Sequence, residues 1–173
     1  MLKNFLSAVV FAVCLFSVNF CSAGKANVCD FGIDAFITRY NDIAKQNNNC
    51  YFIDSPEKMK SDNKFDYYGV ALSDPAKIIF IFNVGKDGFI DSFSMSNYLQ
   101  NNDENFAAAV IDTLSTIGAN YDEISALADG LKENLTADKW IANINRYVFI
   151  VSQTRNSQNG NGITKTLNFF AMK

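Results

Sequence analysis

The sequence predicts an α+β fold, a single domain built on a largely antiparallel sheet of about five or six strands. An N-terminal helix and a helical hairpin are expected on one face of that sheet. Three observations predict this arrangement. An apolar stripe with helical period comes first, strand-like runs stand on both sides of a central helical region, and most runs are joined by hairpin-like turns. A parallel α/β fold would need strands and helices in regular alternation, which this chain lacks.

Residues 1–23 have the layout of a signal peptide. Lys3 is the only charge, an apolar run extends from Phe5 to Phe20, and small residues end at Ala23. We expect cleavage after Ala23, which leaves residues 24–173 as one exported domain, long enough to bury a core. The predicted location is secreted or periplasmic, the signal has a bacterial appearance, and the chain meets the membrane only transiently. An uncleaved membrane anchor is the alternative, although the run is short for a span of ~20 residues.

The first element of the domain is a helix predicted from Ile33 to Lys45. Asp30 or Asp34 can cap its start, and the Asn-rich residues 46–49 end it. Its apolar residues recur at helical spacing and must pack against another element. They are Ile33, Phe36, Ile37, Tyr40, Ile43 and Ala44.

Four strands should follow this helix. The third is apolar on both faces, as in a central strand. Asp87 and Gly88 form a hairpin turn between the third and the fourth. The fourth alternates, with Phe89, Phe93 and Met95 on one face and Ser92, Ser94 and Ser96 on the other. The four predicted strands are residues 50–53, 65–73, 77–84 and 89–96.

The remainder of the chain predicts two more helices and two more strands. The helices cover about 103–117 and about 122–135, and Thr136 can cap a further short turn through Trp140. Two strand-like runs close the chain, joined by a polar loop rich in Asn and Gly. The runs are residues 146–154 and 164–172, and the loop is residues 155–163.

Cysteine usage predicts one disulfide. Cys14 and Cys21 leave with the signal peptide, so Cys29 and Cys50 remain in the exported domain. Two cysteines in an exported chain favour a Cys29–Cys50 bridge that closes a loop around the first helix. Two buried thiols are the alternative.

The absence of histidine limits the chemistry. None of the 173 residues is a histidine, which excludes Ser/His/Asp and Cys/His mechanisms and the usual zinc sites. Neighbouring carboxylates such as Asp122 and Glu123 stand at predicted helix starts, where the helix dipole favours acids. We therefore predict that the protein is not an enzyme, with no catalytic residue, no metal site and no cofactor.

The charge of the chain argues against nucleic acid as a partner. The chain has 15 basic and 18 acidic residues, and residues 1–23 contain only Lys3 among them. The exported domain is therefore mildly acidic, whereas nucleic-acid binding demands a basic face.

Two sets of residues are candidates for binding. Arg155 lies in the predicted polar loop, where a guanidinium could hold a partner's carboxylate. Aromatic side chains could instead line an apolar pocket between sheet and helices, although core packing explains most of them. The candidate lining residues are Tyr67, Tyr68, Phe93 and Trp140.

Together these features predict an exported, non-enzymatic binding or interaction module. Its partner would be an unknown protein or envelope component, bound through an exposed apolar patch on the helix-free face of the sheet. The alternatives are a carrier of small apolar ligands and a hydrolase that uses carboxylates alone. Each alternative needs a deep pocket and at least one acid with a perturbed pKa.

Overall fold

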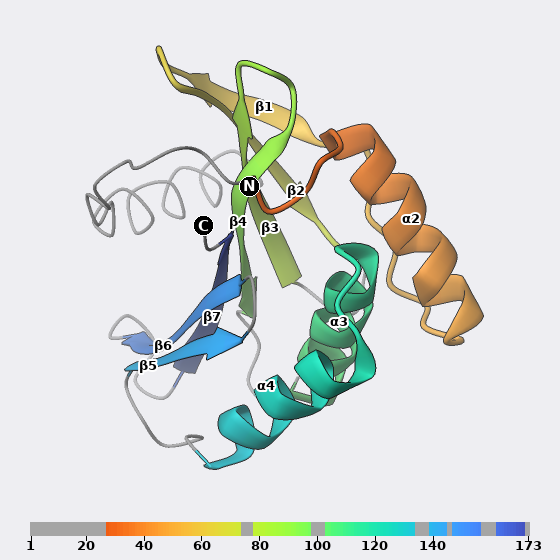
Figure 1. The fold of residues 1–173 in the computed structure, drawn as a ribbon, viewed down its shortest axis with the longest axis vertical. Coiled ribbons are helices and arrows are strands. Elements are labelled where there is room, and N and C mark those ends of the chain that lie inside the picture. The colour runs from red at the N-terminus through yellow and green to blue at the C-terminus, as the bar shows by residue number, and fades with distance from the viewer. Residues whose placement is uncertain are drawn as a thin grey trace.

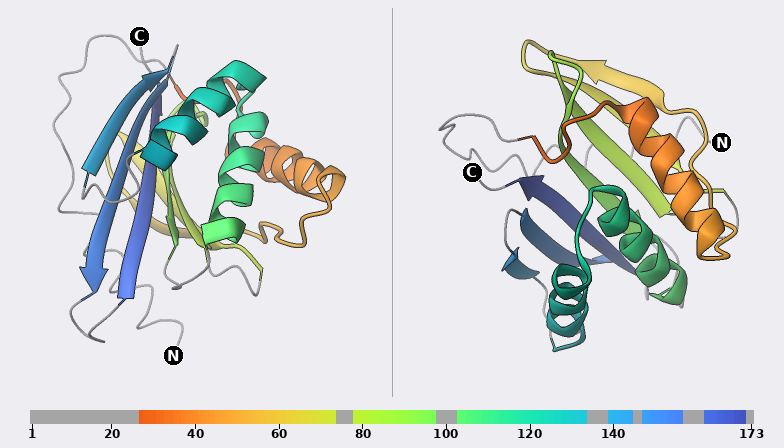
Figure 2. Two further views of the ribbon diagram at one scale, coloured as in Figure 1. Left: turned by 90° about the horizontal axis from the view of Figure 1, so that it is seen from below. Right: turned by 45° about the vertical axis from the view of Figure 1, so that its right-hand side comes forward.

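A seven-stranded sheet with helices on one face makes up the described chain. The computed structural model describes residues 27–73, 78–97, 103–133, 139–144, 147–156 and 162–171. Figure 1 shows the elements, and the edge-on view in Figure 2 places the labelled helices on the same side of the sheet. In chain order they are α2 (Ile33–Gln46), β1 (Glu57–Ser61), β2 (Phe65–Ala71), β3 (Ile78–Gly85), β4 (Ile90–Asn97), α3 (Asp103–Thr116), α4 (Tyr121–Glu133), β5 (Lys139–Ile144), β6 (Tyr147–Asn156) and β7 (Gly162–Ala171).

The strand order is β1-β2-β3-β4-β7-β6-β5. Every neighbouring pair is antiparallel, and the C-terminal strand β7 lies between β4 and β6. The predicted α+β class, the single domain and the helices on one face are therefore confirmed, with more strands than expected. Because β7 joins the two halves of the sheet, the chain forms one structural unit.

An aromatic cluster holds α2 on the sheet. Phe36 and Tyr40 are fully buried on the inner face of this helix. The ring centroid of Phe36 lies 5.0 Å from that of Phe82 and 5.4 Å from that of Phe93. Tyr40 meets Phe80 at 5.8 Å, with the two rings edge to face. These contacts explain the predicted helical stripe, because Phe36 and Tyr40 enter the layer between helix and sheet and Ile33 and Ile37 pack against it.

The predicted strand at residues 50–53 does not form. Only Ile53 makes a β-bridge, an isolated one to Leu72. The side chain of Asn41 bonds both backbone groups of Ile53, with its Nδ2 donating to the carbonyl at 2.9 Å and its Oδ1 accepting from the N–H at 2.8 Å. A side chain of α2 therefore satisfies backbone groups that a neighbouring strand would otherwise take.

The two edge strands of the sheet, β1 and β5, were not predicted. β1 has the sequence EKMKS and is mostly exposed, so its charges hide the strand pattern. β5 includes Trp140, where a short helical turn was expected. Its burial alternates as a strand requires, with Ala142 buried and Ile141 exposed.

The β3–β4 hairpin confirms the predicted alternation, with one correction. Phe93 and Met95 are buried on the helix side, and the serines of β4 lie on the other face. Phe89 was assigned to the same face as Phe93, but it lies in the turn before β4 and is 40% exposed. The pairing register shifts between Asn83 and Val84, and this irregularity separates the turn from the regular ladder.

Polar side chains lie in the middle of the sheet face opposite the described helices, and the serines of β4 are buried there. Asn83 Nδ2 donates to Ser92 Oγ at 2.9 Å, and the hydroxyls of Ser96 and Thr166 lie 3.1 Å apart. In the described residues, the most exposed large apolar side chains belong to four different parts of the chain, and the expected apolar patch stays a prediction. They are Phe89, Ile111, Tyr121 and Ile141.

The expected Cys29–Cys50 disulfide is absent. Both residues are thiols, Cys29 buried and Cys50 exposed. The 14-residue helix α2 separates them, and it spans about 20 Å. Cys29 bonds the backbone of Ile90 at the start of β4, whereas the carbonyl of Cys50 accepts from Ser73 beyond the end of β2. A disulfide requires Cα atoms within about 7 Å, which this arrangement does not allow.

Thiol labelling tests this separation. Alkylation of the folded protein without reductant should modify Cys50 quickly and leave Cys29 until the chain unfolds, because only the Cys50 side chain is exposed. Intact mass before and after unfolding counts the labels. If both thiols stayed unlabelled until a reductant was added, the result would support the predicted Cys29–Cys50 disulfide and contradict this separation.

Candidate functional site

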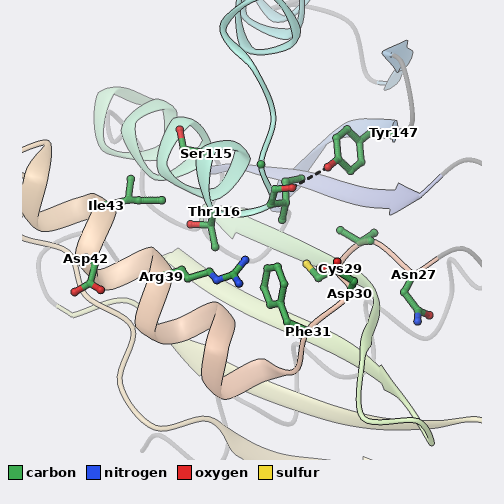
Figure 3. A pocket seen from close by; sticks show the side chains of 13 residues that line it. Asn27, Cys29, Asp30, Phe31, Arg39, Asp42, Ile43, Ser115, Thr116 and Tyr147 are labelled. Carbon is green, nitrogen blue, oxygen red and sulfur yellow. Dashed lines mark hydrogen bonds between the residues drawn. The ribbon is translucent and has the colours of Figure 1, made fainter.

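A cavity of about 590 Å3 lies beside the N-terminal segment of the described chain. We call it the N-terminal cavity (Figure 3). Its walls come from four parts of the fold that are distant in the sequence. They are residues 27–31, the α2 residues Arg39, Asp42 and Ile43, residues 115–118 at the end of α3, and Tyr147 at the start of β6.

Residues 27–31 form one wall because backbone hydrogen bonds attach them to β4. The N–H groups of Val28 and Cys29 donate to the carbonyls of Asp91 and Ile90, both at 3.2 Å. The N–H of Ile90 donates back to the carbonyl of Phe31 at 3.4 Å. Val28 and Cys29 are buried, so this wall is a fixed part of the fold.

Arg39 supplies the positive charge of the cavity. Its guanidinium carbon lies 4.1 Å from the ring centroid of Phe31, a cation–π contact that fixes the plane of the guanidinium. Figure 3 shows the side chain reaching from α2 toward this ring. In the described part of the chain, the Arg39 guanidinium makes no hydrogen bond and no ion pair. Its N–H donors are therefore available to a ligand.

The end of α3 and Tyr147 form the opposite wall. The Tyr147 hydroxyl donates to the carbonyl of Ile117 at 3.0 Å, and the Thr116 hydroxyl donates to the carbonyl of Asp112 at 2.7 Å. Gly118 ends the helix with a φ of 80°, a conformation that favours glycine. The carbonyl end of the helix dipole thus lies at the cavity and contributes negative potential.

Several hydrogen-bond acceptors also line the cavity. Asn27 Oδ1 is buried and has no hydrogen-bond partner in the described structure. The carboxylates of Asp30 and Asp42 also line the cavity. Neither of them makes a hydrogen bond or an ion pair within the described residues. The cavity therefore combines one available cation with two carboxylates and an unsatisfied amide oxygen.

The aromatic residues expected to line a pocket lie apart. Tyr67 and Tyr68 are on β2, near one edge of the sheet, whereas Trp140 is on β5 at the other edge. Trp140 packs against Gly130 of α4, and Phe93 lies in the aromatic core under α2. The structure therefore does not bring these four side chains to one site.

Arg155 lies in strand β6, where it pairs with Ile163 of β7, although a loop was expected there. Its side chain and residues 157–161 lie outside the described residues. The sequence analysis did not select Arg39, because an exposed cation on a helix is typical of a solvated face. Only the folding of Phe31 against it reveals its role in a cavity wall.

A second group of charges lies at the β1–β2 hairpin, away from the N-terminal cavity. Asp66 Oδ1 is 2.6 Å from Lys86 Nζ, and its Oδ2 is 3.0 Å from Lys58 Nζ. The hydrogen bond from Lys86, followed by those from Ser61 and Lys58, holds the pKa of Asp66 well below its usual range. A general acid would need the opposite shift. We therefore interpret this cluster as a set of interactions that stabilises the end of the β1–β2 hairpin.

Asp62 of this hairpin provides a test of pH dependence. Backbone N–H groups of Phe65 and Lys64 and the hydroxyl of Tyr67 lower the pKa of Asp62 to about 2. An unfolded aspartate has a pKa of about 3.9. The stability contributed by Asp62 is thus complete above pH ~4 and is lost as the pH falls toward ~2.

Asp62→Asn should therefore flatten the loss of stability between pH ~4 and ~2. Denaturant titrations at several pH values measure this slope. Asp54→Asn, an exposed carboxyl before β1, should keep the wild-type slope. Identical slopes for wild type and Asp62→Asn would contradict the prediction.

The described residues contain neither a membrane-spanning helix nor a metal-binding cluster. No helix there has both the length and the apolar character needed to cross a bilayer. No group of three or more His, Cys, Asp or Glu side chains in that part of the chain is placed to hold a metal ion. The chain also matches no family model, no curated protein and no solved structure.

Proposed function

We propose that the chain is an exported, non-enzymatic binding module that holds a small ligand in the N-terminal cavity. One observation carries the proposal. Arg39 is held in a fixed plane by Phe31, while its N–H donors have no acceptor within the described residues. A guanidinium positioned in advance binds at a lower entropic cost than a mobile side chain. The volume of about 590 Å3 is also in the range of small-molecule sites.

The predicted signal peptide supports the exported half of the proposal. Cleavage after Ala23 would leave only residues 24–26 ahead of the cavity wall. Val28 and Cys29 are attached to β4 through their backbone, so residues that remain after cleavage hold this wall in place. The cleaved chain would therefore keep the whole cavity.

The non-enzymatic half rests on the chemistry of the side chains. Without histidine, the cavity would have to use Asp30, Asp42, the Cys29 thiol or the Tyr147 hydroxyl for any proton transfer. Two carboxyls with a clearly lowered pKa, Asp62 and Asp66, lie at the β1–β2 hairpin. Binding therefore accounts for the cavity with fewer requirements than catalysis does.

A thermal-shift panel tests the proposal. Small organic anions, cations, zwitterions and a fatty acid are added to the purified protein. At saturation, at least one class should raise the Tm by about 5 °C or more. Arg39→Ala should keep the Tm of the unliganded protein, because the side chain is exposed, and should lose the ligand-induced shift.

Lys45→Ala is the matched control, since Lys45 is an exposed cation on the same helix that does not line the cavity. It should keep the full shift. A panel in which no class raises the Tm would contradict the proposal. A shift from the fatty acid that survives Arg39→Ala would favour an apolar-ligand carrier instead.

A further inference from the structure

The N-terminal cavity has two chemically different ends. Figure 3 shows Arg39 on one side of Phe31 and Cys29, and Asn27 on the other side. The Arg39 end offers hydrogen-bond donors and a positive charge, with the carboxylate of Asp42 on the same helix beside it. The other end offers acceptors, from Asn27 Oδ1 and the carboxylate of Asp30.

The Arg39 end suits a carboxylate. The guanidinium presents parallel N–H groups that match the two oxygens of a carboxylate. Stacking on Phe31 leaves the edge of the guanidinium free for such a pair.

The opposite end suits an ammonium group. Asn27 Oδ1 is a buried acceptor that no described group satisfies, and leaving such an atom unpaired destabilises the empty protein. An ammonium group carries three donors and no acceptor. The carboxylate of Asp30 adds negative potential at this end of the cavity.

Ligands with one charge fit the cavity less well. An anion would meet Arg39 but also the negative potential of Asp30 and Asp42. A cation would leave Arg39 without a partner in a site shielded from part of the solvent. An apolar molecule would desolvate all of these groups without replacing their hydrogen bonds.

Building on the proposed function, we infer that the N-terminal cavity binds a small zwitterion, with the carboxylate on Arg39 and the ammonium between Asn27 and Asp30. The chemical class is a free α-amino acid or a short peptide. Both carry an ammonium and a carboxylate in one molecule. Apolar lining from Val28, Phe31 and Ile43 receives the rest of the ligand.

Calorimetric titration of the purified, exported protein tests this class. The probes are the standard amino acids and di- and tripeptides made from them, with each binding amino acid also tested as its methyl ester and its N-acetyl derivative. Removing either charge should weaken binding about tenfold or more. Binding of free amino acids or of peptides identifies which source the cavity prefers, and either result supports the inference.

Two variants test which end of the cavity binds the carboxylate of the ligand and which binds its ammonium group. Arg39→Ala should weaken the amino acid but leave its methyl ester unchanged, whereas Asp30→Asn should weaken the amino acid but leave its N-acetyl derivative unchanged. Both residues are exposed, so both variants should fold. Lys45→Ala should bind like the wild type.

Blocked derivatives that bind as tightly as the parent amino acid would overturn the zwitterion inference. The proposed function would survive that result if binding still required Arg39. Failure of every amino acid and peptide to bind would also overturn the inference, and the thermal-shift panel would then decide separately whether the cavity holds another class of ligand.

Discussion

Phe36→Ala should lower the free energy of unfolding by about 3–5 kcal/mol. The Phe36 ring is completely buried and meets the rings of Phe80, Phe82 and Phe93 within the layer between α2 and the sheet. Truncation removes these contacts and leaves a cavity that the sheet below cannot fill without strain. A domain of this size is stable by about 5–15 kcal/mol, so the loss is a large fraction of the total.

Chemical denaturation followed by circular dichroism measures this effect. Phe89→Ala is the matched control, because the same side chain is removed from a turn position that is 40% exposed. The control should lose less than about 1 kcal/mol. Equal losses in the two variants would contradict the aromatic core described above.

Asp112→Ala should cost about 2–4 kcal/mol of stability. The Asp112 carboxylate is buried on α3 and accepts a hydrogen bond of 2.6 Å from the side-chain amide of Asn47 and another from that of Asn49. Each is a charge-assisted bond, the stronger class in proteins. Together they attach the loop after α2 to α3. Burial raises the pKa of Tyr40 of α2, and the negative charge of Asp112 raises it further.

Asp129→Ala is the control for this carboxylate, because Asp129 is exposed on α4. Denaturant titration should place the control within about 0.5 kcal/mol of the wild type. If Asp112→Ala were equally stable, the two amide contacts would not hold α2 and α3 together.

The stability variants and the ligand-binding variants should differ in the property that each of them loses. Phe36→Ala removes a residue from the buried face of α2, whereas Arg39→Ala changes the exposed side of the same helix. We expect the first to lose stability, and the second to lose ligand binding with stability kept. This separation is the expected sign of a binding residue on a rigid element.

The elements with a clear apolar period could be predicted from the sequence. α2 and the β3–β4 hairpin follow because the burial of Phe36, Tyr40 and Phe93 repeats at helix or strand spacing. β1 could not be predicted because its charged residues keep an exposed edge in solvent. The short run at 50–53 looked like a strand, but hydrogen bonds from Asn41 hold Ile53 in place instead.

The candidate site could not be predicted for a different reason. Arg39 and Phe31 carry no motif, and the cavity exists only after segments from the N-terminus, α2, α3 and β6 meet. The disulfide prediction was wrong for the same reason, because it too depends on how distant segments are placed. Cysteine count and the expected export favoured a bridge, but the length of α2 keeps Cys29 and Cys50 apart. Both outcomes depend on how distant segments of the chain are arranged in three dimensions. The spacing of residues along the sequence does not show that arrangement.

Native mass spectrometry of the protein purified from its own cell envelope tests the central claim most directly, because one spectrum reports both export and occupancy. We predict a chain that begins at Gly24 and carries a small noncovalent adduct, and the same chain without the adduct for Arg39→Ala. A chain that still begins at Met1, or an adduct that Arg39→Ala retains, would contradict an exported module that binds its ligand in the N-terminal cavity.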